Sequence, residues 1–182
     1  MARILPNLRQ TVIRAGFSLF VTIFLCQCAQ RNQIIVSVAD QKLALLKEGR
    51  TKIYPVSTSK FGLGDRPGSR CTPLGKMKIA AKIGGGYPIG TVFKSRRPTG
   101  EILKPNTPGR DPIVTRILWL KGLESSNRNA FKRYIYIHGT PEEYRIGSPA
   151  SYGCVRMKSS DIGRIICTLA FNCSQLSPSQ HR

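Results

Sequence analysis

The sequence predicts a mainly β fold with one helix near its carboxyl end, and three observations support this prediction. Short runs of β-branched and aromatic residues recur, as in IIVSV at 34–38 and YIYIH at 134–138, and such runs are typical of strands. Seventeen glycines and twelve prolines favour many turns over long helices. Apolar residues at helical spacing come late, after Ser159. Because 182 residues suit one domain, we expect a single-layered or barrel-like β domain with one packed helix.

The first part of the domain is expected to be an antiparallel meander that leads into a long loop. Glu48-Gly49-Arg50 has turn composition and separates two strand-like runs. Residues 61–75 (FGLGDRPGSRCTPLG) carry four glycines and two prolines, which favours a loop. Polar and apolar residues alternate in a later run, as in a half-buried strand. The strands expected in this part are 34–38, 43–47, 52–57 and 76–82.

The second part contains another long loop, two strands and the helix. Gly84–Asp111 is rich in glycine and proline, and a loop of this length usually carries function or short strands of its own. A lid over a binding site and a disordered connector are both open readings of this stretch. Strands are expected at 117–120 (ILWL) and 134–138. Ser159-Ser160-Asp161 offers N-cap chemistry, and one apolar helix face follows at Ile162, Ile165, Ile166 and Leu169.

The amino-terminal segment is expected to be an export signal. Three arginines precede the apolar run Ala15–Leu25, and no acidic residue occurs before Asp40. The run has the length of a signal-peptide apolar region and is short for a membrane span. An uncleaved anchor and a lipid-modified Cys28 are the alternatives. We therefore divide the chain into a signal or anchor (1–29), a main domain (30–170) and a polar tail (171–182), and expect it in the periplasm or cell envelope.

The charge and the remaining cysteines restrict the function further. A formal net charge of +20, from 29 basic and 9 acidic residues, favours polyanionic partners such as nucleic acid, acidic lipid or an anionic wall polymer. Nucleic-acid binding is disfavoured because the chain carries an export signal and no recognised nucleic-acid motif. Cys167 and Cys173 could form a disulfide, although a sequence does not show connectivity. A ribbon-type zinc site has little support, since no CxxC spacing is present.

Two residues carry the chemistry that we expect. His138 ends an apolar strand where the chain enters a loop, a rigid mounting for a general base. Cys154 follows sixteen residues later, directly after Gly153, which permits a tight approach of the backbone. The amides of Gly153 and Cys154 could then face a developing oxyanion. A structural histidine and a buried, inert cysteine are the competing interpretations.

These motifs resemble a known enzyme signature. Ile137-His138-Gly139-Thr140, followed by Ser151-Tyr152-Gly153-Cys154-Val155-Arg156-Met157, is similar to that of the L,D-transpeptidase catalytic domain (YkuD type). Val56-Ser57-Thr58 and Thr72-Pro73-Leu74-Gly75 resemble two upstream motifs of that family. The similarity extends from about Ile34 to about Leu169, and four motifs in the right order are a specific signal.

The resemblance implies a fold, a reaction and roles for individual residues. The fold is a β-sandwich or barrel with a helix after the cysteine motif. Cys154 is the nucleophile and His138 the base, and the Gly139 carbonyl orients the imidazole ring. Family members attack the diamino acid carbonyl of a peptidoglycan stem tetrapeptide at its L-centre and release D-alanine. The thioester then passes to an amine of another stem peptide, to an envelope protein or to water, and no metal or organic cofactor is implied.

Other positions in the motifs receive weaker assignments. Many relatives have a second histidine where this chain has Tyr152, and a tyrosine does not shuttle protons near neutral pH. His138 is therefore expected to be the sole base. Arg156 could bind a substrate carboxylate or form a surface salt bridge, and Ser151 and Thr140 could hydrogen-bond near the site or cap turns. After the helix, 171–182 shows no strand pattern, so the family's last strand is expected to be missing.

A second function class stays open from the sequence. A basic exported domain could bind peptidoglycan without chemistry, and such a binder has no use for an accessible, acidic thiol. The accessibility and the surroundings of Cys154 therefore discriminate between the enzyme and the binder.

Overall fold

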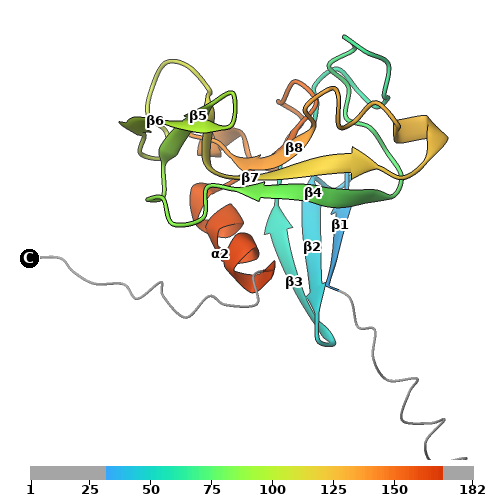
Figure 1. Cartoon of the computed structure of the whole chain (residues 1–182), viewed down its shortest axis with the longest axis horizontal. Coiled ribbons are helices and arrows are strands. Elements are labelled where there is room, and N and C mark those ends of the chain that lie inside the picture. Colours follow the sequence, from blue (N-terminus) through green and yellow to red (C-terminus); the bar gives the residue numbers. More distant parts are fainter. Residues whose placement is uncertain (1–31, 170–182) are drawn as a thin grey trace, which may run out of the picture.

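A computed structural model describes residues 32–169 of the chain, which form two β-sheets and one α-helix. Figure 1 shows the β1–β3 sheet and helix α2 on the same side of the long strands β4 and β7. The prediction of a mainly β sandwich-like domain with one helix after the cysteine motif is confirmed. The expected export signal, Cys28, Cys173 and the tail lie outside the described residues.

The first sheet is the predicted meander. Its strands β1 (Gln33–Ser37), β2 (Lys42–Lys47) and β3 (Arg50–Pro55) pair antiparallel in the order β1-β2-β3. Glu48 and Gly49 connect β2 to β3 with φ angles of 50° and 73°. Positive φ at both central residues is the geometry that fits a two-residue turn to the twist of a hairpin.

The second sheet contains six strands in the order β6-β5-β7-β8-β9, with β4 paired to β7. All of its pairings are antiparallel except β8 with β9. Strands β5 and β6 lie within Gly84–Asp111, so this stretch does have short strands of its own, and the disordered-connector reading is wrong. The strands are β4 (Met77–Ile83), β5 (Thr91–Lys94), β6 (Arg97–Ile102), β7 (Ile113–Gly122), β8 (Tyr136–Gly139) and β9 (Val155–Met157).

Helix α2 (Ser159–Leu169) covers the core face of this sheet. Its side chains Ile162, Ile165 and Ile166 are buried, as the apolar spacing predicts. They join Leu118 of β7, Ile137 of β8 and residues of the first sheet in the main hydrophobic core. Burial of such side chains stabilises the fold by about 1.5–3 kcal/mol each. Within residues 32–169, no helix is long and apolar enough to cross a membrane.

The opposite face of the second sheet carries a smaller cluster that includes the candidate nucleophile. Phe93, Ile117 and Tyr136 are buried there, and Cys154 packs against them. Because successive side chains of a strand alternate between faces, β8 directs Ile137 into the core and Tyr136 and His138 to this second face.

Candidate active site

Strands β8 and β9 place His138 and Cys154 on one face of the sheet. In their parallel register Ile137 pairs with Val155 and His138 with Arg156, and Cys154 directly precedes Val155. Cys154 and Arg156 therefore face the same side as His138, since residues two apart share a face. The imidazole and the thiol are diagonal neighbours, a relationship that separates Cα atoms by about 7–8 Å in sheets.

The Cys154 thiol is half-buried between backbone groups of one neighbouring segment. It donates a hydrogen bond to the Tyr134 carbonyl oxygen, with sulfur and oxygen 3.4 Å apart, and the Tyr136 N–H donates to the sulfur at 3.4 Å. Burial raises the pKa of this thiol from 9.0 to about 11, against the opposing effects of the Tyr136 N–H, Arg133 and Arg156. The resting thiol is consequently protonated near neutral pH.

His138 is buried and has one ring nitrogen fixed by the backbone. Its Nδ1 lies 2.8 Å from the carbonyl oxygen of Gly139. A carbonyl only accepts hydrogen bonds, so Nδ1 carries the hydrogen and Nε2 has its lone pair available. Burial lowers the pKa of His138, an effect that Arg156 adds to, while the Gly139 hydrogen bond and Asp111 oppose it. The ring is therefore neutral near neutral pH and able to accept a proton at Nε2.

The thiol and the imidazole do not hydrogen-bond each other in the described structure. The sulfur's hydrogen-bonding partners are Tyr134 and Tyr136, and that of the imidazole is Gly139. The resting site thus holds a neutral thiol and a neutral imidazole rather than a thiolate–imidazolium pair. Such contacts are often long in ligand-free enzymes and shorten when substrate binds.

The turn before Cys154 depends on Ser151 and Gly153. Gly153 has a φ of +120°, a conformation that strongly favours glycine. Ser151 Oγ donates to the Cys154 carbonyl oxygen at 2.6 Å and accepts from the Gly153 N–H at 3.2 Å. The Gly153 amide is therefore engaged, and of the two amides expected to face an oxyanion, Cys154 N–H is the better candidate.

The two upstream motifs, Val56-Ser57-Thr58 and Thr72-Pro73-Leu74-Gly75, hydrogen-bond to strand β9 and to this turn. Ser57 forms a two-way backbone bridge with Arg156, with N–O distances of 2.9 and 2.8 Å. Thr72 Oγ1 donates to the Gly153 carbonyl oxygen at 3.0 Å and accepts from the Ser59 N–H at 3.0 Å. These motifs therefore position the segment that contains the nucleophile.

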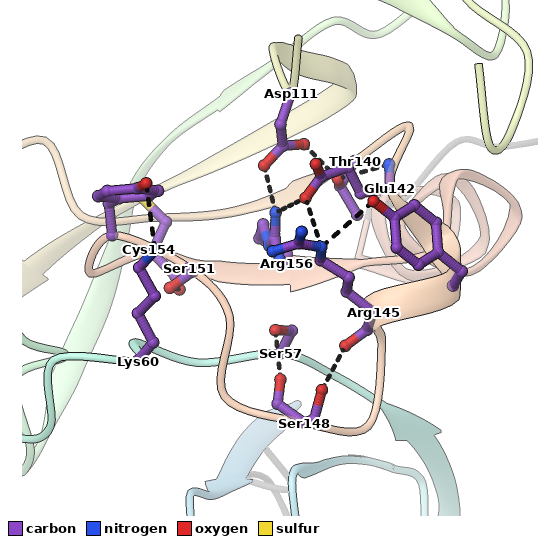
Figure 2. Close-up of polar contacts among 12 residues, drawn as sticks. Ser57, Lys60, Asp111, Thr140, Glu142, Arg145, Ser148, Ser151, Cys154 and Arg156 are labelled. Carbon is purple, nitrogen blue, oxygen red and sulfur yellow. Dashed lines mark hydrogen bonds and ion pairs between the residues drawn. The ribbon is translucent and has the colours of Figure 1, made fainter. Parts of the chain in front are cut away.

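Arg156 lies in a buried charged cluster. The residue is 2% exposed, which rules out the surface salt bridge considered from the sequence. Figure 2 shows Asp111, Thr140 and Glu142 gathered around its guanidinium, with Cys154 to one side. Nη1 pairs with Asp111 and, at 3.0 Å, with Glu142, and Thr140 Oγ1 donates to Asp111. Nε and Nη2 of Arg156 are buried and have no hydrogen-bond partner within the described residues.

Sequence reasoning missed Asp111 and Glu142 as members of the site. In the sequence, Asp111 is the last residue of a Gly/Pro-rich stretch, and Glu142 comes two residues after the Ile137–Thr140 motif. Neither position has a pattern that indicates a site. Their significance depends on a distant arginine being buried, which a local pattern does not reveal.

The Tyr152 hydroxyl accepts a hydrogen bond from Lys60 in the described structure. The residue is 59% exposed, and its ring packs against that of Phe61, with centroids 5.4 Å apart. Lys60 Nζ lies 4.7 Å from the Tyr152 ring centroid and donates to its hydroxyl at 3.3 Å. The tyrosine thus belongs to an exposed aromatic and cationic surface beside the nucleophile turn.

The β5–β6 hairpin reaches over the aromatic side chains beside Cys154. Its turn residue Arg96 lies 4.7 Å from the Trp119 ring centroid and 5.2 Å from that of Tyr134. Arg96 also donates to the Tyr136 hydroxyl at 3.4 Å. Because Tyr134 and Tyr136 are the backbone partners of the thiol, this hairpin borders the site that a lid would cover.

A comparison with protein-family models gives a match over most of the chain. A model described as the L,D-transpeptidase catalytic domain (YkuD) matches residues 31–169. No curated protein matches the chain. Within residues 32–169, no group of three or more histidine, cysteine, aspartate or glutamate side chains is arranged to hold a metal ion.

Proposed function

The chain belongs to the L,D-transpeptidase catalytic domain family, and we propose that it transfers acyl groups of peptidoglycan stem peptides through a thioester on Cys154. The observation that carries the proposal is the shared sheet face of Cys154 and His138, which the β8–β9 register fixes. The half-buried thiol and the oriented neutral imidazole beside it are the two groups that such a transfer requires.

The acylation step begins with both groups neutral. Nε2 of His138 removes the thiol proton as Cys154 Sγ forms a bond to the carbonyl carbon of the diamino acid residue. Because the thiol pKa is about 11, proton removal accompanies attack instead of preceding it. The electron pair of the carbonyl moves onto its oxygen, where the Cys154 N–H can donate a hydrogen bond.

Breakdown of this intermediate releases D-alanine. The C–N bond to D-alanine breaks, and the imidazolium of His138 returns its proton to the leaving amine. A thioester on Cys154 remains, and His138 is again neutral. In the second half-reaction His138 accepts a proton from the attacking amine, or from water, and the C–S bond breaks with return of that proton to sulfur.

The other assigned residues support this chemistry by positioning. Gly139 orients the base through its carbonyl, Ser151 and Gly153 shape the nucleophile turn, and Thr140 orders Asp111 beside Arg156. In this proposal Arg156 binds a substrate carboxylate only after the cluster with Asp111 and Glu142 opens, because its Nε and Nη2 are buried in the described structure. Tyr152 offers an exposed ring at the rim, suited to contact with the peptide or its glycan.

We further propose that the protein works in the cell envelope, where peptidoglycan is found. The basic amino-terminal residues and the apolar run Ala15–Leu25 support export of the chain. The acyl acceptor in this proposal is a second stem peptide, an envelope protein or water.

Incubation of the purified full chain with defined disaccharide tetrapeptides tests the proposal. Mass spectrometry is expected to show loss of D-alanine and a cross-linked or hydrolysed product. Cys154→Ser is the matched control and is expected to give neither, because His138 would have to deprotonate a much weaker acid. A carbapenem is expected to form an adduct on Cys154 of the wild type. If the wild type binds muropeptides but gives no product and no adduct, the non-catalytic binder replaces the enzyme.

A further inference from the structure

Three aromatic rings beside the candidate nucleophile, those of Trp119, Tyr134 and Tyr136, form a cage that already holds a cation. The guanidinium of Arg96 lies 4.7 Å from the Trp119 ring centroid and 5.2 Å from that of Tyr134. It also donates a hydrogen bond to the Tyr136 hydroxyl at 3.4 Å. The Trp119 centroid lies 5.8 Å from that of Tyr134 and 5.9 Å from that of Tyr136. Rings of these two types bind ammonium and guanidinium groups through their quadrupole.

Aromatic faces, rather than carboxylates, hold the cation in this cage. Within residues 32–169, no carboxylate forms an ion pair with Arg96. Arg96 is only half-buried, so another cation can replace its guanidinium without opening the hydrophobic core. The cage therefore has a chemistry that selects a positively charged group, and its present occupant is displaceable.

The turn that presents Arg96 is not explained by the needs of the hairpin. Ser95 and Arg96 connect β5 to β6 with φ angles of 49° and 67°. A turn with positive φ at both positions favours Asn-Gly, because most other residues rarely adopt this conformation. A long side chain held in such a sparsely populated conformation points to a role for that side chain. The role that the contacts support is to place a guanidinium in the cage.

The cage shares residues with the immediate surroundings of the nucleophile. The Tyr136 N–H donates to the Cys154 sulfur and the Tyr134 carbonyl oxygen accepts from it, each at 3.4 Å. Cys154 and Trp119 also pack against the same small cluster, which includes Tyr136. In the proposed reaction the attacked carbonyl belongs to the diamino acid residue, whose free side-chain amine is positively charged near neutral pH. A cation on the reacting residue would therefore lie beside the cage.

We propose that the cage binds the side-chain ammonium group of the diamino acid in the acyl donor, and that Arg96 fills the cage until the donor displaces it. This inference rests on the proposed function, because the donor is taken from that reaction. The β5–β6 hairpin moves aside as Arg96 leaves the cage. A donor whose amine already forms an amide lacks the positive charge and binds more weakly, so the cage selects stem peptides with a free amine.

Equilibrium binding of disaccharide tetrapeptides to the full-length Cys154→Ser protein tests the proposal without turnover. Peptides with lysine or diaminopimelate at the third position are used, each with its side-chain amine free or acetylated. Calorimetric titration gives the amine preference, which is the Kd of the acetylated peptide divided by that of the free one. The chain has a single tryptophan, so fluorinated tryptophan supplied during expression alters Trp119 alone. Fluorination weakens the ring quadrupole with little change in volume.

The Cys154→Ser protein is expected to prefer the free amine of at least one diamino acid about fivefold, the contribution of one cation–π site. Stepwise fluorination of Trp119 is expected to reduce this preference toward one. Adding Arg96→Ala is expected to tighten binding of the free-amine peptide severalfold, because no guanidinium then competes for the cage. The matched control Arg97→Ala removes one charge at the first residue of β6 and is expected to leave binding unchanged.

An amine preference of one for both diamino acids would overturn the proposal, as would a preference that tetrafluorotryptophan does not reduce. Equal effects of Arg96→Ala and Arg97→Ala would overturn the role of Arg96, because net charge alone would then explain them. A preference that persists in wild-type protein after a carbapenem has acylated Cys154 would assign the cage to the acceptor and overturn the donor assignment. Release of D-alanine by the wild type tests the proposed function separately. Equal release from free and acetylated peptides would retain the transferase and reject the cage, whereas an amine preference without turnover would do the reverse.

Discussion

The sulfur of Cys154 lies 3.4 Å from the backbone nitrogen of Tyr136. Tyr136 is on strand β8, two residues before His138, the assigned base. This N–H donates to sulfur and favours the thiolate, but burial has the larger effect and holds the pKa at about 11. The resting nucleophile is therefore a thiol.

The pH dependence of alkylation tests the protonation of this thiol. Since the thiolate reacts and the pKa is about 11, the rate of Cys154 modification by iodoacetamide is expected to rise throughout pH 7–10. Peptide mapping by mass spectrometry separates Cys154 from Cys71 and Cys167. A rate that reaches its plateau below pH 8 would instead indicate a preformed thiolate–imidazolium pair.

The acid limb of the acylation rate tests His138. Burial lowers its pKa below 6.5, so the ring stays neutral, and active as a base, in mildly acidic solution. The value of kcat/KM for a tetrapeptide is expected to fall only below pH 6.5 as the pH decreases. His138→Ala is expected to lose most activity at every pH and to abolish this limb. An unchanged limb in that variant would assign it to another group.

Substitution of Arg156 tests the buried ion cluster. Arg156→Met leaves Asp111 and Glu142 without their shared cation, so unfolding by urea is expected to show a loss of about 3–5 kcal/mol. The matched control Arg145→Ala removes an exposed partner of Glu142, 3.4 Å away, and is expected to cost less than about 1 kcal/mol. Adding Asp111→Asn and Glu142→Gln to Arg156→Met is expected to restore part of the stability. Similar losses for Arg145→Ala and Arg156→Met would contradict the buried arrangement.

Substitution of two glycines tests whether the Gly139 backbone orients the His138 imidazole. A Cβ added at Gly139 would lie 2.6 Å from the Val114 carbonyl oxygen, whereas one at Gly85 would meet nothing within 4 Å. Gly139→Ala is expected to displace the carbonyl that orients His138, and therefore to reduce both acylation and thermal stability. Gly85→Ala, measured in parallel, is expected to match the wild type in both assays. Full activity of Gly139→Ala would show that this close packing is unimportant.

Fluorescence tests whether the β5–β6 hairpin closes over the aromatic side chains. The chain has a single tryptophan, Trp119, and the Arg96 guanidinium lies 4.7 Å from its ring centroid. Arg96→Ala is expected to increase quenching of Trp119 by acrylamide, because the ring loses its cover. Arg97→Ala, at the first residue of β6, is the control and is expected to leave quenching unchanged. Identical quenching in all three proteins would argue against the hairpin as a lid.

Much of the fold could be predicted from residue patterns, because alternation and spacing report which face of an element is buried. The helix at Ser159–Leu169 and the β2–β3 turn at Glu48-Gly49 agree with the sequence. Strand β7 was predicted only at 117–120 but extends from Ile113 to Gly122. Arg116 and Thr115 lie in the unpredicted part, where polar residues are buried by contacts that come from elsewhere in the chain.

The candidate site was only partly predictable for the same reason. Short motifs indicated His138, Cys154 and their neighbours because glycine, cysteine and histidine occurred in a specific order. The carboxylates around Arg156 come from a loop end and a turn, and the sequence left Arg156 open between a substrate ligand and a surface salt bridge. A buried charge is stabilised by groups that converge only in three dimensions, so no local pattern indicated the cluster.

The bridge between Ser57 and Arg156 has a consequence for how the protein acquires its activity. It joins positions 99 residues apart, one after the first sheet and the other in the last strand. A contact between such distant positions requires closure of a long loop, which costs conformational entropy, so we expect it to form late in folding. A truncated chain that lacks Ser57 would therefore carry Cys154 without this anchor of strand β9. Maturation of the thiol into a catalyst is thus expected to coincide with completion of the whole domain.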